Sequence, residues 1–167
     1  MKSFHLSACV VALVVGAFIV FLRKGTKVHR SLGRLYVGAT MAYAVSSFFM
    51  YPSTGRFTPF HAISIQSAML VVSGVALSRV LRSTVPDWRV WHLRFMLYSY
   101  VALVVTGLRF TLPYVLPGSR IWPVVVFVAL PLCSWGWVER RVVPHWRTKS
   151  RPAFRPPASG LSGRGDR

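Results

Sequence analysis

The sequence predicts an all-α integral membrane protein, an up-down bundle of five transmembrane helices, and two observations lead to this fold class. The 167-residue chain is 53% hydrophobic, with a mean hydropathy of +0.48. Only 14% of its residues are charged, and 21 Lys and Arg stand against three acids, whereas a soluble domain mixes both signs over roughly a quarter of its residues. A mostly apolar chain whose positive charges lie between long uncharged runs is typical of membrane proteins rather than of nucleic-acid-binding modules.

Five apolar runs supply the five helices. Four of them have 17 or 18 residues without a charge, and the remaining one, Trp91–Leu112, is interrupted by Arg94 and Arg109. This length crosses a hydrocarbon core of ~30 Å at ~1.5 Å per residue, and backbone groups in lipid must be satisfied within their own segment. We therefore expect a transmembrane domain over residues 1–143, with helices near residues 4–22, 32–51, 59–78, 91–112 and 121–138.

The distribution of Lys and Arg predicts the orientation. The segments before the second helix, before the fourth helix and after the fifth helix hold five, four and eight cations, and the opposite side holds four of the 21. Loops rich in Lys and Arg stay in the cytoplasm. We expect the N-terminus outside and the C-terminus inside a plasma (inner) membrane, where the loop cations face anionic lipid headgroups at ~1 kcal/mol each.

The C-terminal segment and the cysteines complete this organisation. Residues 144–167 are rich in Pro, Arg, Ser and Gly, which predicts a disordered basic cytoplasmic tail because such a composition cannot bury a core. Cys9 and Cys133 fall at different depths of the membrane in this topology, which argues against a disulfide between them.

Two helix starts share one pattern. Thr26 precedes the second helix, and Thr58 precedes the third, with Pro59 at its first helical position. Thr is a good N-cap, and Pro at this position loses no hydrogen bond. His29 and His61 then take the third helical position, where a capping box has Glu or Gln. Each imidazole is therefore either a cap or, kept neutral by the helix dipole, a ligand.

Polar residues form a stripe on each of two helices, and such stripes point into a bundle rather than at lipid. Hydrogen bonding between helices and a substrate path are both open interpretations of these stripes, and Arg109 either snorkels to the outer surface or binds an anion. The second helix carries His29, Gly33, Tyr36, Thr40, Tyr43 and Ser47, and the fourth carries His92, Ser99, Thr106 and Arg109.

Small residues on the second helix predict a second kind of contact. Gly38, Ala42 and Ser46 follow one another at four-residue steps. Small residues at this spacing let two membrane helices approach closely, so we expect this ridge to be a packing surface.

Four histidines lie near helix ends and suggest two cofactor sites. His5 and His61 fall at the outer ends of the first and third helices, and His29 and His92 fall at the inner ends of the second and fourth. In an up-down bundle these helices are diagonal partners, which gives the pairs His5/His61 and His29/His92. Low-spin haem takes two axial imidazoles from facing helices, so haem b is the cofactor that this layout predicts.

Other chemistry is excluded by what the chain lacks. No Asp or Glu lies in a predicted crossing, which removes intramembrane carboxylate relays and carboxylate-pair catalysis. The sequence also contains no glycine-rich phosphate loop, no zinc-protease motif and no nucleophile elbow.

Three stretches carry a resemblance to a known family: "KGTKVHRSLGRLYV", "GRFTPFHAISI" and "WHLRFMLYSY". With them the chain, from about Phe4 to Arg109, resembles a bacterial family of predicted membrane proteins, domain of unknown function 2306. The resemblance implies a membrane domain of four or five helices and marks His29, His61 and His92 as candidate functional residues. It implies no reaction.

Two functional hypotheses follow. In the first, the protein is a cytochrome b-like redox subunit that holds a cofactor by paired histidines. In the second, it is a non-enzymatic membrane subunit, such as an assembly factor, a transporter or a lipid-interacting partner, and its histidines are structural. Its partners are then lipid, another membrane protein or a second copy of the chain, and binding of nucleic acid through the basic tail has the weakest support.

Overall fold

Over the residues that it describes, 2–49, 55, 59–115 and 125–150, the computed structural model is helical and contains no strand, which confirms the all-α class. The elements in chain order are α1 (Lys2–Phe21), α2 (Lys27–Phe48), α4 (Pro59–Arg79), the 3₁₀ turn η1 (Leu81–Ser83) and α5 (Trp88–Val115), then the π-helical turn η2 (Val125–Ala129), α7 (Leu130–Trp137), a second π-helical turn η3 (Val138–Val142) and α8 (Val143–Ser150).

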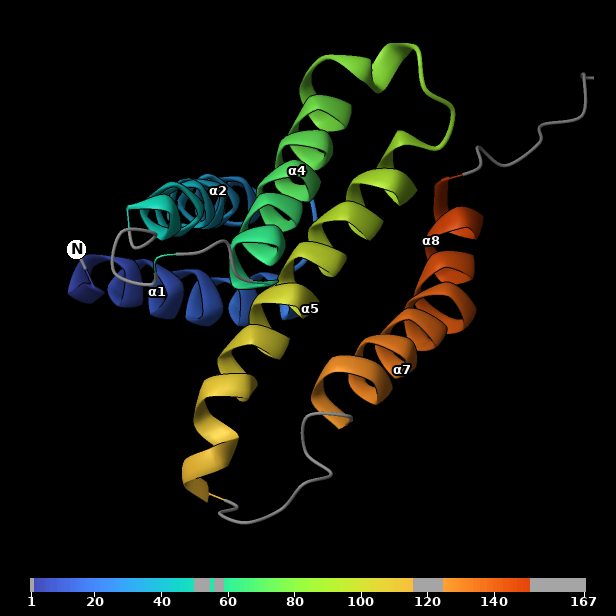
Figure 1. Cartoon of the computed structure of the whole chain (residues 1–167). Helices are drawn as coiled ribbons and strands as arrows, with labels where there is room; N and C mark the ends of the chain where they lie inside the picture. The colour runs from blue at the N-terminus through green and yellow to red at the C-terminus, as the bar shows by residue number, and fades with distance from the viewer. Residues whose placement is uncertain (1, 50–54, 56–58, 116–124, 151–167) are drawn as a thin grey trace, which may run out of the picture.

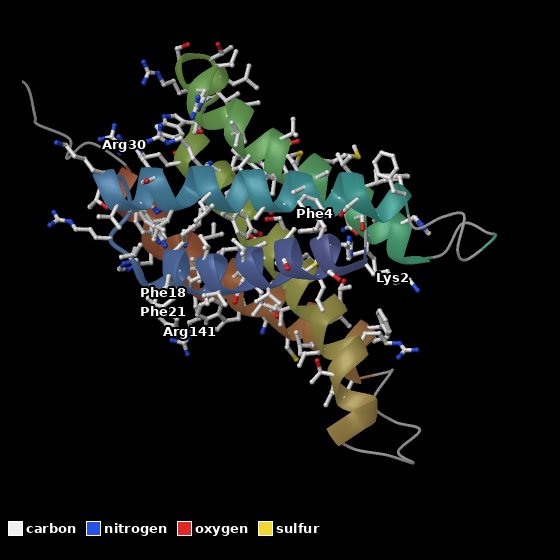
Figure 2. All side chains as sticks on the ribbon, turned by 90° about the vertical axis from the view of Figure 1, so that its left-hand side faces the viewer. Lys2, Phe4, Phe18, Phe21, Arg30 and Arg141 are labelled. Atoms are coloured by element: carbon white, nitrogen blue, oxygen red, sulfur yellow. The ribbon has the colours of Figure 1, made fainter. Side chains whose placement is uncertain are left out.

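The helices form two hairpins and a C-terminal arm. The contacts of α1 with α2 and of α4 with α5 are the most extensive, α2 also packs on α4, and α1 touches α5. The segment from η2 to α8 lies along the other side of α5 (Figure 1). Both views show α1 and α2 running across α4 and α5 rather than parallel to them (Figures 1 and 2), an inclination common when i, i+4 ridges interlock. The structure thus differs from a bundle with parallel axes.

The turn between α1 and α2 is specified by its sequence. Lys24 Nζ donates to the carbonyls of Ile19 and Val20 at 2.6 and 2.9 Å, which satisfies two of the free carbonyls at the end of α1. Gly25 adopts a φ of 83° that favours glycine. Thr26 then caps α2, because its Oγ1 accepts from the backbone N–H of His29 at 3.1 Å. The predicted cap at Thr26 is confirmed, whereas Thr58 lies outside the described residues.

Three helices are long and apolar enough to cross a membrane: Lys2–Phe21, His61–Arg79 and Trp88–Arg109. Large apolar side chains such as Phe4, Phe18 and Phe21 point outward from α1 (Figure 2), as expected of surface that faces lipid. Helix α2 is different because Lys27, Arg30 and Arg34 occupy its first turns. A second and a fifth crossing, and the orientation in the membrane, therefore stay predictions.

The C-terminal arm docks on α5 through an ion pair and through an apolar cluster of Val90, Val138 and Val143. Arg94 of α5 donates to Glu139 of η3 at 2.6 Å, and the Tyr98 hydroxyl donates to the other carboxylate oxygen at 2.8 Å. The Arg94 guanidinium also stacks over the Trp91 ring at 4.7 Å. The arm continues as α8 through Ser150, so residues 144–150 are helical where disorder was expected, and residues 151–167 lie outside the described part.

Close helix contact occurs at glycines that were not predicted to make it. An added Cβ at Gly16 of α1 would lie 2.5 Å from Cδ2 of Tyr100 and 3.0 Å from Cε2 of Tyr36. In contrast, Gly38 of the predicted small-residue ridge is exposed, and a Cβ there would meet nothing within 4 Å. The prediction for Gly38 is therefore wrong, because the buried face of α2 is the one that carries Tyr36, Ala39 and Tyr43.

Substitution of these two glycines should separate packing from helix propensity. Gly16→Ala should lower stability by about 1–3 kcal/mol, because the new methyl group collides with two aromatic rings. Gly38→Ala is the matched control, and it should be neutral or slightly stabilising because Ala is the better helix former. Melting temperatures in detergent measure both. A Gly38→Ala protein that melts lower than Gly16→Ala would contradict this packing.

Candidate functional site

Two histidines at one end of the hairpins form the candidate site, and His92 is held as a ligand would be. His92 lies in the second turn of α5, and its Nδ1 is 2.7 Å from the carbonyl oxygen of Gly74 on α4. A carbonyl only accepts, so Nδ1 carries a proton, and in the neutral form of the ring the lone pair is on Nε2. A hydrogen bond of this kind on the far nitrogen fixes the tautomer and orientation of metal-ligating histidines.

His29 approaches from α2 and has no hydrogen bond at its buried ring nitrogen. Its backbone N–H is bonded to Thr26, but its Nδ1 is buried and finds no partner among the described residues. The ring therefore does not replace the Glu of a capping box, since that role requires a bond back to the backbone of Thr26. Native proteins rarely leave a buried polar atom unpaired, and such an atom often marks a bound group.

Electrostatics keep His29 neutral. Burial lowers the pKa of His29, and the positive charge of Lys24 and the ring of His92 lower it further. Burial also lowers the pKa of Lys24. The Tyr36–Ser99 hydrogen bond, one heptad further along, joins the two helices that carry these histidines. Neutral imidazole is the form that ligates metals, so this end of the protein presents two imidazoles from different helices in the ligand form.

The same register continues into the protein interior. Tyr36 and Ser99 each lie seven residues after the histidine of their helix, and the Tyr36 hydroxyl donates to Ser99 Oγ at 3.0 Å. Ser99 can accept because its own proton goes to the carbonyl of Met96. Further along α2, Thr40 and Tyr43 are also buried. The polar stripe of α2 therefore faces the other helices, while its use as a path stays a prediction.

The other stripe candidates on α5 do not join this interior. The Thr106 hydroxyl donates to the carbonyl of Ala102 on its own helix at 2.9 Å, a bond that satisfies the hydroxyl locally. Arg109 is partly buried near the end of the crossing. The structure thus brings Tyr36, Thr40, Tyr43 and Ser99 to the interior, whereas the Thr106 hydroxyl is bonded within its own helix.

The outer histidines have different surroundings. Ser46 Oγ donates to the carbonyl of Tyr43, so it accepts from His5 Nδ1 at 2.9 Å. The Cys9 thiol donates to His5 Nε2 at 3.6 Å, which occupies the second ring nitrogen. His61 is 5% exposed, and its ring lies beside Phe48, with centroids 6.1 Å apart. Both histidines therefore lie near the C-terminal end of α2, but His5 has no nitrogen left for a ligand.

Several partners in these sites were missed from the sequence. Cys9 lies one turn after His5, and i, i+4 spacing was a usable signal. The partnership of Glu139 with Arg94 could also have been predicted. An Arg inside an apolar run needs an acidic partner, and the chain has only three acids. The carbonyl of Gly74 carried no signal, because backbone acceptors occur throughout the sequence.

Metal sites with three or more protein ligands are absent from the described residues. No group of three His, Cys, Asp or Glu there could hold an ion. The free cysteines Cys9 and Cys133 are not paired with each other.

The pKa of His29 provides a direct check on this geometry. We expect it below its usual value of 6.5, so any stability that depends on neutral His29 is present above pH 6.5 and is lost as the pH falls below it. Lys24→Gln should raise this pKa by removing a nearby positive charge, whereas Lys27→Gln, at an exposed position, should not. NMR titration of labelled imidazoles, assigned with His29→Asn, measures the value. A pKa of 6.5 or above in the unsubstituted protein would contradict the burial of this ring.

Comparison with known proteins gives one match. The family described as Predicted membrane protein (DUF2306) matches residues 3–145. This range extends beyond Arg109, where the resemblance in the sequence ended, and includes most of the C-terminal arm. Neither the curated proteins nor the solved structures contain a match. Because the family covers most of the chain, the protein belongs to the predicted membrane protein family DUF2306.

Proposed function

We propose that the protein is a cytochrome b-like redox subunit of the membrane, in which His29 and His92 ligate one haem. The observation that carries this proposal is the hydrogen bonding of the two imidazole rings. His92 has its Nδ1 fixed on the Gly74 carbonyl, and the buried Nδ1 of His29 lacks a partner. Low-spin haem takes two axial imidazoles from facing helices.

The donor set fits this group better than it fits a lone metal ion. A structural zinc site needs about four protein ligands, whereas a haem brings four nitrogens of its own and takes two axial ligands. When bound, haem supplies one-electron transfer. The chain would hold it with His29 and His92, orient His92 through Gly74, and keep His29 neutral through burial and Lys24.

The proposal covers one site rather than two. A haem between His5 and His61 would displace the Cys9 thiol from His5 Nε2 or Ser46 from Nδ1. Each lost bond within an apolar interior leaves a polar atom unpaired at a cost of about 1–3 kcal/mol. We therefore assign His5 a structural role that ties α1 to the end of α2.

Polar bonds between helices in other parts of the structure favour a second candidate function. His5 with Ser46, and Arg94 with Glu139, show polar groups used to fasten helices together. Exposed tryptophans on the C-terminal arm, Trp135 and Trp137, offer apolar surface to lipid or to another membrane helix. In this alternative the protein is a non-enzymatic membrane subunit, and His29 and His92 also serve packing.

The visible spectrum separates the two functions. Protein purified after expression with sufficient haem and iron should absorb as a low-spin b-type haem when it is reduced. His29→Ala and His92→Ala should each abolish the spectrum, because bis-imidazole ligation needs both rings. His5→Ala should keep it. His145→Ala, at an exposed histidine of α8, is the matched control for a general loss of histidine.

Two results would refute the redox function. Protein that is colourless after reduction and free of metal by elemental analysis leaves the non-enzymatic subunit as the function. A spectrum that survives in both His29→Ala and His92→Ala would place the cofactor elsewhere.

The proposed orientation has the N-terminus outside and the C-terminus inside, with five crossings of a plasma membrane. It rests on the cation count, with 17 of 21 Lys and Arg on the inner side. A reporter that is active only in the cytoplasm should work after Lys149, and a reporter active only outside should work at Ser53. An external reporter that is active after Lys149 would reverse this topology.

A further inference from the structure

Three buried hydroxyls on α2 and α4 have no hydrogen-bond partners among the described residues. They belong to Thr40, Tyr43 and Ser67. These residues are 0%, 5% and 1% exposed, so bulk water does not reach them. Buried hydroxyls in native proteins are almost always bonded to protein or to an ordered water. Three orphans in one place therefore point to a bound group rather than to three separate defects.

The three hydroxyls converge on one region. Thr40 and Tyr43 lie one turn apart on the same face of α2. The Tyr43 and Ser67 hydroxyls are close enough across the α2–α4 interface to influence each other as hydrogen-bonding groups, but their oxygens do not reach hydrogen-bond geometry. Thr40 likewise lies beside Tyr36. Near contacts that fall short of hydrogen-bond geometry are what a bridging water between polar groups produces.

Hydrogen-bonded groups continue on both sides of this region. On one side, Tyr36 donates to Ser99 at 3.0 Å. The other side begins at Cys9, which lies near Tyr43 and donates to His5. Polar side chains therefore run from Ser99 through Tyr36, the three unpaired hydroxyls and Cys9 to His5. The hydrogen bonds along this series are missing at the three hydroxyls.

We propose that Thr40, Tyr43 and Ser67 bind water, and that this water completes a proton path between Ser99 and His5. Hydroxyls, water, thiol and imidazole each accept a proton on a lone pair while they release the proton they held. One proton enters at one end and one leaves at the other, and no other bond changes. The His29/His92 rings belong to the same two helices as Tyr36 and Ser99, one heptad (~10 Å) before them. This path needs no haem, so it does not depend on the proposed redox function.

Proton flux through the reconstituted protein tests the path. Vesicles of neutral and anionic lipid, loaded with a pH-sensitive dye and clamped at zero potential with K⁺ and valinomycin, receive an external acid pulse. Thr40→Val, Tyr43→Phe and Ser67→Ala each remove a hydroxyl and keep the shape of the side chain. Each should lower the flux above the protein-free level by about tenfold. Thr111→Val is the matched control, because Thr111 is exposed on α5 and bonded to the carbonyl of Gly107.

A second measurement on the same variants tests the water itself. If water bridges the hydroxyls, Thr40→Val and Ser67→Ala should each lower the melting temperature in detergent, because a water partner is lost. If the hydroxyls have no partner, the same changes should leave the melting temperature unchanged or raise it, and that result would overturn the water site. Flux no greater than that of protein-free vesicles, or equal flux in the unsubstituted protein and all three variants, would overturn the proton path.

Discussion

The need to pair every polar group inside an apolar protein determines most of this structure. A membrane offers no water to a hydroxyl, an imidazole or a guanidinium, so each must find its partner within the chain. His5 bonds to Ser46 and Cys9, Tyr36 to Ser99, His92 to a backbone carbonyl, and Arg94 to Glu139. These bonds fix the helices relative to one another. Apolar contact alone would not do so, because a Leu side chain is about as stable against lipid as against another helix. Exceptions to the rule are therefore informative. Among the described residues they are Nδ1 of His29, Nε of Arg94 and the hydroxyls of Thr40, Tyr43 and Ser67.

Charge and hydropathy predicted the helical class and the helix-bearing regions, because uncharged runs and their cationic borders are properties of single segments. The cap at Thr26 was readable for the same reason, since it depends on residues three apart. Packing was less accessible. Gly38 looked like a contact residue by its spacing to Ala42 and Ser46, but it is exposed, whereas Gly16, in a run of ordinary apolar residues, touches two aromatic rings. Which face of a helix meets a neighbour depends on all the helices at once.

The histidines illustrate the same limit at the candidate sites. Their positions at helix ends were visible in the sequence, and so was the seven-residue step from His29 to Tyr36 and from His92 to Ser99. His5 and His29 looked equally suited to bind a cofactor in the sequence, but their hydrogen bonds differ. Both ring nitrogens of His5 have partners, whereas the buried nitrogen of His29 has none. The difference arises from Cys9, one turn further along α1, and from Ser46 of α2. The relevance of Ser46 appears only once the first hairpin is packed.

The ion pair between Arg94 and Glu139 also bears on how the protein is made. The two residues are 45 positions apart in the chain, so Arg94 leaves the ribosome well before its partner. During that interval α5 carries an uncompensated guanidinium in its second turn, which only Trp91 covers. A membrane-inserting helix with an unpaired Arg is held at the interface by the cost of desolvating the charge. Translation of the C-terminal arm thus releases α5 to settle, and a chain that stops before Glu139 leaves this helix without its anchor.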